Sequence, residues 1–152
     1  MKKLYLTLLI SLFLFTGCNK KNLDGEKFTS IMEKKGFKIY NVIEQYNQGK
    51  QDLVKTALIA SNENAGYQIE FLIFKSVDAC KNSFTVNRSA FRENKTEKDK
   101  ETSVSKDKYS KYTLTSKDTY YVVSRKGDTL MYLYVDGSYK NEVDSILSEL
   151  GF

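Results

Sequence analysis

The chain has no histidine and no proline. The first absence limits the metal sites and catalytic mechanisms available to it, and the second limits how its turns are made. Histidine is the commonest zinc ligand and the commonest general base, so zinc sites and histidine-dependent catalysis are disfavoured. Proline normally makes up about 5% of residues, so the turns here must rely on Gly, Asn and Asp. Motifs for calcium loops, phosphate-binding loops and nucleophile elbows are also absent. We expect no cofactor and no metal.

Cysteine occurs only twice, at Cys18 and Cys80. If Cys18 carries a lipid, Cys80 is a lone thiol and no disulfide forms within the chain, so packing must supply the stability. Cys80 shares its expected helix face with apolar residues, and there is no histidine to activate it. We therefore interpret Cys80 as a packed structural residue rather than a nucleophile.

Arginine is also scarce, because only Arg88, Arg92 and Arg125 stand among the 24 basic residues. Bidentate recognition of phosphates and base edges favours arginine, so this dispersed, lysine-dominated charge argues against nucleic acid as a partner. A solvated surface explains most of the lysines. A modest attraction to anionic lipid head groups or wall polymers is the alternative.

What the chain does have is a distinctive beginning, MKKLYLTLLISLFLFTGC. Two lysines precede an apolar run over residues 4–15, which fits the core of a signal peptide and is shorter than the roughly 20 residues that span a bilayer. The ending FTGC resembles the lipobox of bacterial lipoproteins, with Phe where Leu is usual. We expect residues 1–17 to be a lipoprotein signal peptide and Cys18 to be lipidated. An ordinary signal peptide and an uncleaved anchor are the alternatives.

Lipidation of Cys18 would anchor the protein to the cell membrane, on its extracytoplasmic face. Removal of residues 1–17 takes away two lysines, so the formal charge falls from +5 to +3. The remaining 135 residues suffice for one domain with a real core. We assign residues 18–25 to the lipidated cysteine and a flexible tether, and residues 26–152 to a single domain.

Apolar spacing predicts three helices, over residues 26–35, 77–92 and 139–150. Ser76 is a suitable N-cap for the second helix. Its apolar stripe consists of Val77, Cys80, Phe84 and Phe91. Gly151 is placed to cap the last helix.

Six segments rich in β-formers predict strands, namely 37–43, 53–60, 67–75, 109–115, 120–126 and 129–136. Segment 129–136 is apolar on both faces and therefore belongs inside a sheet. The segment 45–51 predicts a loop. Residues 92–108 mix both charges around a single apolar residue, Val104, and predict a long mobile loop.

These elements define an α+β fold with a mostly antiparallel sheet of five or six strands. Their order along the chain is α-β-β-β-α-β-β-β-α. We expect the helices over 77–92 and 139–150 to pack together on one face of this sheet.

Eleven tyrosines are unusual for a chain of this length, and several crowd the second half of the sheet. Tyrosine combines apolar area with a polar tip, which suits recognition surfaces but also suits half-buried strands. We place the candidate contact surface near Tyr120, Tyr121 and Arg125. Glu70 is a further candidate binding residue, and an envelope protein or a wall polymer is the expected ligand.

Glu70 also carries the one enzymatic hypothesis. A pair of carboxylates can hydrolyse glycosides without histidine, so Glu70 with a second acidic residue is the basis for a carboxylate-dependent hydrolase of cell-wall polysaccharide. A cross-strand ion pair between Glu70 and Arg125 explains the same residues equally well. We favour a binding or interaction module, with the hydrolase as the alternative.

Several stretches of the chain resemble a family of small uncharacterised bacterial lipoproteins from low-GC Gram-positive bacteria. Besides the lipobox, they are YQIEFLIF, SKYTLTSKDTYYVVSRKGDTLMYLYVD and the closing NEVDSILSELGF. The resemblance covers residues 26–152. It implies a class of protein and a cellular address, and it carries no established activity or catalytic residues.

Overall fold

The computed structural model describes residues 23–47 and 52–152, so the expected signal peptide and Cys18 lie outside the described residues. Its elements are α1 (Gly25–Lys34), β1 (Lys38–Asn41), α2 (Ile43–Asn47), β2 (Val54–Asn62), β3 (Tyr67–Phe74), α3 (Val77–Arg92), β4 (Lys100–Lys106), β5 (Tyr109–Ser116), β6 (Thr119–Lys126), β7 (Thr129–Asp136), a 3-10 turn (Gly137–Tyr139) and α4 (Lys140–Leu150). Leu23 is buried and Asp24 caps α1, so the folded part begins slightly before residue 26.

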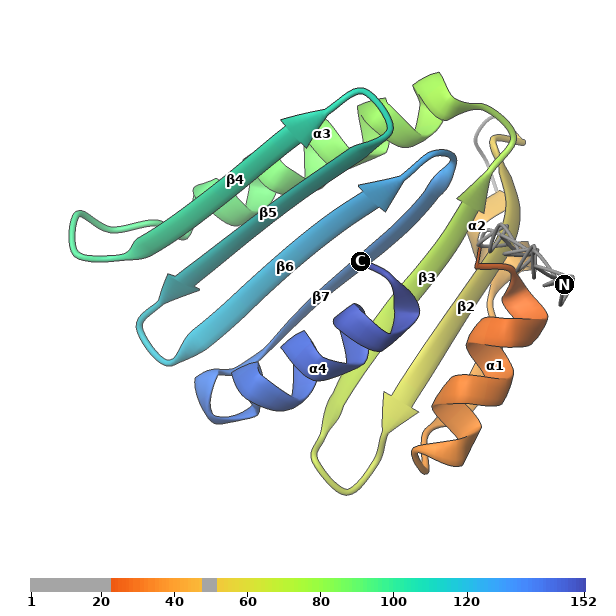
Figure 1. Ribbon diagram of the computed structural model, residues 1–152, viewed down its shortest axis with the longest axis horizontal. Helices are drawn as coiled ribbons and strands as arrows, with labels where there is room; N and C mark the ends of the chain where they lie inside the picture. Colours follow the sequence, from red (N-terminus) through yellow and green to blue (C-terminus); the bar gives the residue numbers. More distant parts are fainter. Residues whose placement is uncertain (1–22, 48–51) are drawn as a thin grey trace, which may run out of the picture.

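The strands form one antiparallel sheet in the order β1-β2-β3-β7-β6-β5-β4 (Figure 1). The α+β class and the antiparallel pairing are as predicted. The sheet has seven strands rather than five or six, because Lys100–Lys106 forms β4 where we expected a loop. β4 pairs only with β5 and is largely exposed. An edge strand of this kind needs no apolar face, so its charged sequence concealed it.

Helices cover both faces of the sheet, which corrects the prediction that they share one face. Figure 1 shows α1 and α4 in front of the sheet and α3 behind it. The front core joins α1 and α4 to side chains that include Leu58, Ile69, Phe71, Val122, Met131 and Leu133. The rear core joins α3 to side chains that include Ala57, Leu72, Tyr112, Val123 and Leu130. Because helices cover the sheet on both sides, the strands over 67–75 and 129–136 need apolar residues on both of their faces.

Local signals in the sequence were largely reliable. Ser76 accepts a hydrogen bond from the backbone N–H of Ala79 and caps α3, as predicted. Gly151 adopts a φ of 85° beyond α4 and closes that helix. The stripe of α3 is buried at Cys80, Phe84 and Phe91, whereas Val77 is exposed. The helix α2 is a difference, since the chain was expected to continue from a strand into a loop there.

Among residues 23–47 and 52–152, no helix has the length and apolar character needed to cross a membrane.

Candidate functional site

The central feature of the sheet is a split between β3 and β7. Their pairing runs from Ile73 opposite Thr129 to Glu70 opposite Tyr132, and it stops there. The first residues of β3, from Tyr67, pair with β2 alone. The last residues of β7, as far as Asp136, pair with β6 alone. The two strands therefore present facing edges that do not pair with each other. We call this opening the β3/β7 notch, bounded by Gln68 and Glu70 of β3 and by Tyr132 and Tyr134 of β7.

Tyr67 holds the start of β3 toward the front helices. Its ring packs against Phe37, with centroids 5.7 Å apart, and against Tyr139, with centroids 5.3 Å apart. Its hydroxyl donates a hydrogen bond of 2.6 Å to the Glu142 carboxylate of α4. These contacts attach the start of β3, which forms one side of the notch, to α4 and the front core rather than to β7.

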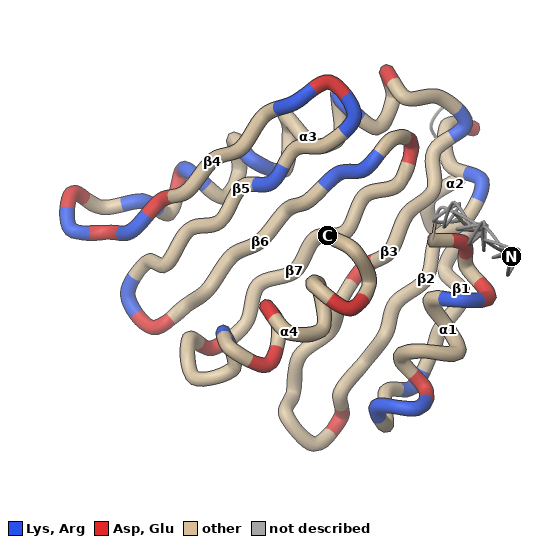
Figure 2. The backbone as a smooth tube through the Cα atoms, in the orientation of Figure 1, with Lys and Arg blue, Asp and Glu red and all other residues tan. Residues whose placement is uncertain are grey.

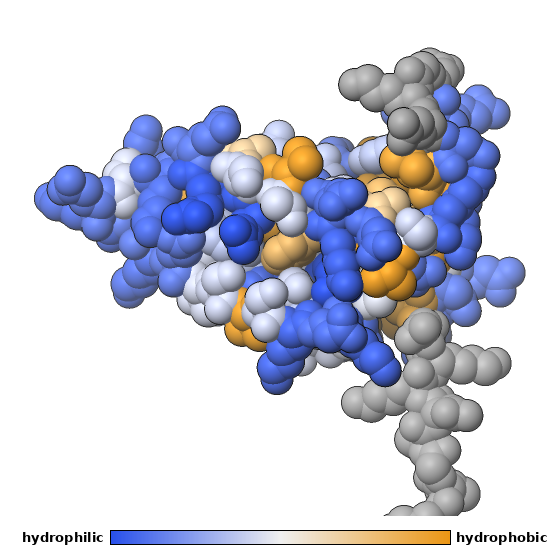
Figure 3. Space-filling model, turned by 90° about the horizontal axis from the view of Figure 1, so that it is seen from above, coloured by the Kyte–Doolittle hydropathy of each residue, from blue (hydrophilic) through white to orange (hydrophobic). Residues whose placement is uncertain are grey.

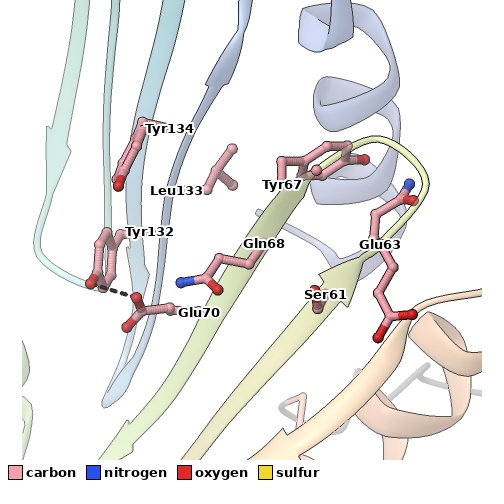
Figure 4. A pocket seen from close by; sticks show the side chains of 10 residues that line it. Ser61, Glu63, Tyr67, Gln68, Glu70, Tyr132, Leu133 and Tyr134 are labelled. Carbon is pink, nitrogen blue, oxygen red and sulfur yellow. Dashed lines mark hydrogen bonds between the residues drawn. The ribbon is translucent and has the colours of Figure 1, made fainter.

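A pocket of about 420 Å³ occupies the notch. Its lining includes Ser61 of β2 and Glu63 of the turn after β2, together with the four residues that bound the notch. Figure 4 shows Gln68 and Glu70 projecting from β3 toward the tyrosines of β7. The lining therefore combines aromatic rings with carboxylate, amide and hydroxyl groups, which is typical of sites that fix a ligand's orientation.

Glu70 is held at the closed end of the notch by two tyrosines. The Tyr132 hydroxyl donates to Glu70 Oε1 at 2.7 Å, and the Tyr46 hydroxyl of α2 donates to Glu70 Oε2. Burial, together with the hydrogen bond to Glu70, raises the pKa of both tyrosines above the usual tyrosine value. Both tyrosines therefore stay neutral donors at physiological pH, and the carboxylate has a fixed position.

Aromatic rings extend from this carboxylate along the rear face of the sheet. Phe91 of α3 lies 5.1 Å from Tyr121 and 6.3 Å from Tyr132, measured between ring centroids. Tyr121 lies 6.2 Å from Tyr134, whose side chain is 64% exposed. Tyr134 is thus a solvent-facing ring at the open edge of a packed aromatic cluster.

The structure does not bring Tyr120, Tyr121 and Arg125 together on one exposed surface, as the sequence analysis expected. Tyr120 is 2% exposed and faces the front core, where its hydroxyl donates to Asp144 of α4 at 2.7 Å. Tyr121 faces the opposite side, as adjacent strand residues must. Arg125 is also 2% exposed. Of the four predicted binding residues only Glu70 lines the notch, with Tyr121 beside it.

The ion pair expected between Glu70 and Arg125 is absent from the described residues. Glu70 lies opposite Tyr132, whereas Arg125 lies opposite Leu130 on β7 and Ser110 on β5. The Arg125 guanidinium donates instead to backbone carbonyl oxygens and to the Ser110 hydroxyl.

Cys80 lies fully buried against the rear core, as predicted. Burial raises the pKa of its thiol to about 12, so the thiolate is scarce at neutral pH. The described residues contain no group of three or more acidic or cysteine side chains suited to a metal ion.

Comparison with known protein families, with curated proteins and with solved structures gives no match to this chain.

Proposed function

We propose that this chain is an extracytoplasmic lipoprotein, anchored to the cell membrane by lipid on Cys18, whose domain binds an envelope ligand in the β3/β7 notch. The observation that carries the binding proposal is the fixed Glu70 carboxylate at the closed end of an open, tyrosine-lined pocket. The anchor rests on the sequence of residues 1–18. An envelope protein or a wall polymer is the ligand class that this location favours.

Anchoring and binding support each other physically. Six residues separate Cys18 from Gly25, where α1 begins, and an extended chain covers roughly 3.5 Å per residue. A domain held within a few nanometres of the membrane meets envelope ligands at high effective concentration, so that modest affinity suffices. Two acyl chains give stable anchoring where a single chain is marginal.

The anchor is tested by replacing the cysteine. We expect C18A to remain unprocessed or to leave the membrane fraction, and we expect the native chain, but not C18A, to incorporate a labelled fatty acid. Normal processing and membrane retention of C18A would contradict the anchor without bearing on the notch.

The notch is tested by capture from envelope extract with the immobilised full chain. We expect the double variant Q68A/Y134A to lose ligands that the native chain retains, because both side chains line the notch and both are exposed. V86A is the matched control, since Val86 is an exposed residue on α3. Equal capture by all three proteins would contradict the assignment of the notch.

A carboxylate-dependent hydrolase of wall polysaccharide is the second candidate, because Glu63 and Glu70 line the same pocket. The hydrogen bond from Lys38 lowers the pKa of Glu63, and Glu70 accepts two tyrosine hydrogen bonds. Glu63 therefore lacks the raised pKa that a proton-donating acid needs. Turnover of peptidoglycan by the native chain, with none by E70Q, would favour the hydrolase over the binding module.

A further inference from the structure

A second pocket, of about 410 Å³, lies at the opposite end of the strands from the notch, between α3 and the turn that joins β4 to β5. Lys81, Thr85 and Arg88 line it from successive turns of α3. The other wall includes Ser105, Lys106, Asp107, Ser110 and Arg125. Figure 2 shows basic residues at the β4–β5 turn and at the end of β6. We call this site the basic pocket.

Arg125 brings a buried positive charge to the basic pocket. Its guanidinium donates to the carbonyl oxygens of Gly127 at 3.1 Å and Asp107 at 2.8 Å. It also donates, at 3.3 Å, to the Lys106 carbonyl oxygen and the Ser110 hydroxyl. All four acceptors are neutral, and Nε takes part in none of these bonds. Because a buried charge is costly without a counter-charge, the site favours an anion.

Arg88 supplies an independent indication that the basic pocket binds an anion. Its Nε atom is buried and has no hydrogen-bond partner among the described residues. Arg92, one turn further along α3, pairs with Glu101 at 3.2 Å. No carboxylate in the described part of the chain pairs with either Arg88 or Arg125. A buried donor without an acceptor is rare in folded proteins, and a bound ion is one of the explanations for such a donor.

The charges that line the basic pocket are unbalanced. Lys81, Arg88, Lys106 and Arg125 are positive, whereas Asp107 is the only acidic residue in the lining. Lys81 approaches the exposed Asp107 carboxylate at 3.5 Å, which is a weak surface pair. Among the described residues, Arg88 and Arg125 have no carboxylate within ion-pair distance.

We propose that the basic pocket binds a phosphate group. Arginine and hydroxyl-bearing residues line it from α3 on one side and from the strands on the other, an arrangement that suits a tetrahedral anion contacted from several directions. The pocket exceeds what one phosphate group needs, so it accommodates an ester substituent.

Two sources supply this chemistry, namely a soluble phosphate and the phosphodiester of an anionic lipid head group. The start of α1 lies at this end of the sheet, because Gly25 is close to Thr56 and Leu58 of β2. If Cys18 is anchored as proposed above, the six residues between Cys18 and Gly25 keep this end of the sheet within reach of the bilayer. Seen from above, the surface is largely hydrophilic with small separate apolar areas (Figure 3). The phosphate site itself does not depend on the anchor.

The test uses the three arginines as reporters, because their side-chain Nε–H groups give separate NMR signals. We expect inorganic phosphate, added to the full chain in neutral detergent, to shift the Arg88 and Arg125 signals saturably and to leave Arg92 unchanged. Acetate should need at least tenfold higher concentration. No saturable shift, an equal shift of all three signals, or an equal response to acetate would overturn the proposal.

Two matched variants distinguish binding in the basic pocket from a general effect of positive charge. R88Q should weaken phosphate binding at least tenfold, whereas R92Q, which removes the same charge one turn away, should change it less than twofold. Equal effects of the two variants would overturn the proposal. R125K keeps the buried charge and should retain the phosphate-induced shift of Arg88; loss of that shift in folded R125Q, with retention in R125K, supports a direct role for the charge.

The source of the phosphate group is identified from the arginine Nε–H signals after reconstitution of the full chain in bilayer discs. A shift of Arg88 and Arg125 in phosphatidylglycerol discs, but not in phosphatidylcholine discs, assigns the site to a lipid head group. A shift with inorganic phosphate and none with phosphatidylglycerol assigns it to a soluble phosphate. An absence of shifts under every condition overturns the site, whatever the outcome for Cys18.

Discussion

Glu70 shows how a single polar residue organises the notch. Its strand is otherwise mostly apolar, and the side chain is half-buried. Hydroxyl groups from Tyr46 and Tyr132 replace the water that the carboxylate loses. The same two bonds tie α2 and β7 to β3, so one carboxylate links three elements.

Replacement of Glu70 by Gln should therefore lower the free energy of unfolding. The variant loses the charge that strengthens both bonds and places an amide N–H₂ beside one hydroxyl donor, at a cost of about 1.5–3 kcal/mol. The measurement is urea unfolding at pH 7. An alkaline titration of tyrosinate absorbance should also show the pKa of Tyr46 and Tyr132 falling toward the usual value. E97Q, in an exposed turn, is the control, and equal stability of E70Q and E97Q would contradict these roles.

Cys80 should be inert in the folded protein because burial holds its pKa at about 12. Iodoacetamide at pH 8 should leave Cys80 unmodified in the native chain and alkylate it in urea, as read by peptide mapping. The unfolded thiol ionises near its ordinary pKa of 9.0, before the folded one. The stabilisation by the neutral thiol is therefore complete below about pH 9 and decreases toward pH 12.

The same pH dependence provides a second check. The difference in unfolding free energy between the native chain and C80A should shrink as the pH rises above 9. Rapid alkylation of Cys80 without denaturant, or a difference that grows with pH, would contradict its burial.

Individual residues also show where prediction from the sequence ended. Glu70 and Arg125 were visible as isolated charges in apolar strands, and pairing them was the simplest solution. The register decided otherwise, because Glu70 lies opposite Tyr132 and Arg125 opposite Leu130. Tyr46 was missed because α2 has five residues, too few for a recognisable apolar period. Strand alternation alone places Leu130, Tyr132 and Tyr134 on one face of β7.

At the scale of elements, a helix's apolar stripe predicted burial but not the face of the sheet. The stripes of α3 and α4 are similar in kind, yet α3 covers the rear core and α4 the front core. The apolar residues on both faces of β7 were the available signal, since a strand of that kind requires two covered faces. The apolar residues on both faces of β7 were therefore better evidence than the assumption that α3 and α4 share one face of the sheet.

The stripe of α3 gives a matched pair of substitutions. Phe84 is 6% exposed, whereas Val86 on the same helix is 68% exposed. F84A should lower the free energy of unfolding by about 3–5 kcal/mol through lost burial and a residual cavity. V86A should change it by less than about 0.5 kcal/mol. A loss below that limit for F84A in urea unfolding would show that α3 presents a different face to the sheet.

The edge strand β4 should open more readily than the interior strand β6. β4 has one paired neighbour and an exposed, charged sequence, whereas β6 is paired on both sides and mostly buried. Hydrogen exchange should therefore be faster for the β4 amides that bond to β5 than for the amides of β6. Equal protection of the two strands would contradict the edge position.

At the scale of the whole molecule, two helical layers enclose a seven-stranded sheet that divides between β3 and β7. The division was not predictable, because it depends on pairing between β3 and β7, segments about 60 residues apart. The seventh strand was missed for a local reason, since β4 is charged and exposed and pairs only with the adjacent β5. Of the proposed site, the sequence offered Glu70 and the tyrosine-rich strand β7, and it gave no sign of the opening between them. The notch is therefore a property of the fold rather than of a motif.

The central claim, a ligand-binding notch on an anchored domain, is tested most directly by photocrosslinking in intact cells. A benzophenone amino acid is placed at Tyr134 in one variant and at Val86 in another, two positions of similar exposure, 64% and 68%. The account predicts a discrete adduct from position 134, none from position 86, and loss of the adduct when Q68A is added. Digestion of the adduct with a protease or a muramidase then separates a protein ligand from a wall polymer. Equal crosslinking from both positions, or none from position 134 in a correctly folded and membrane-bound chain, would contradict it.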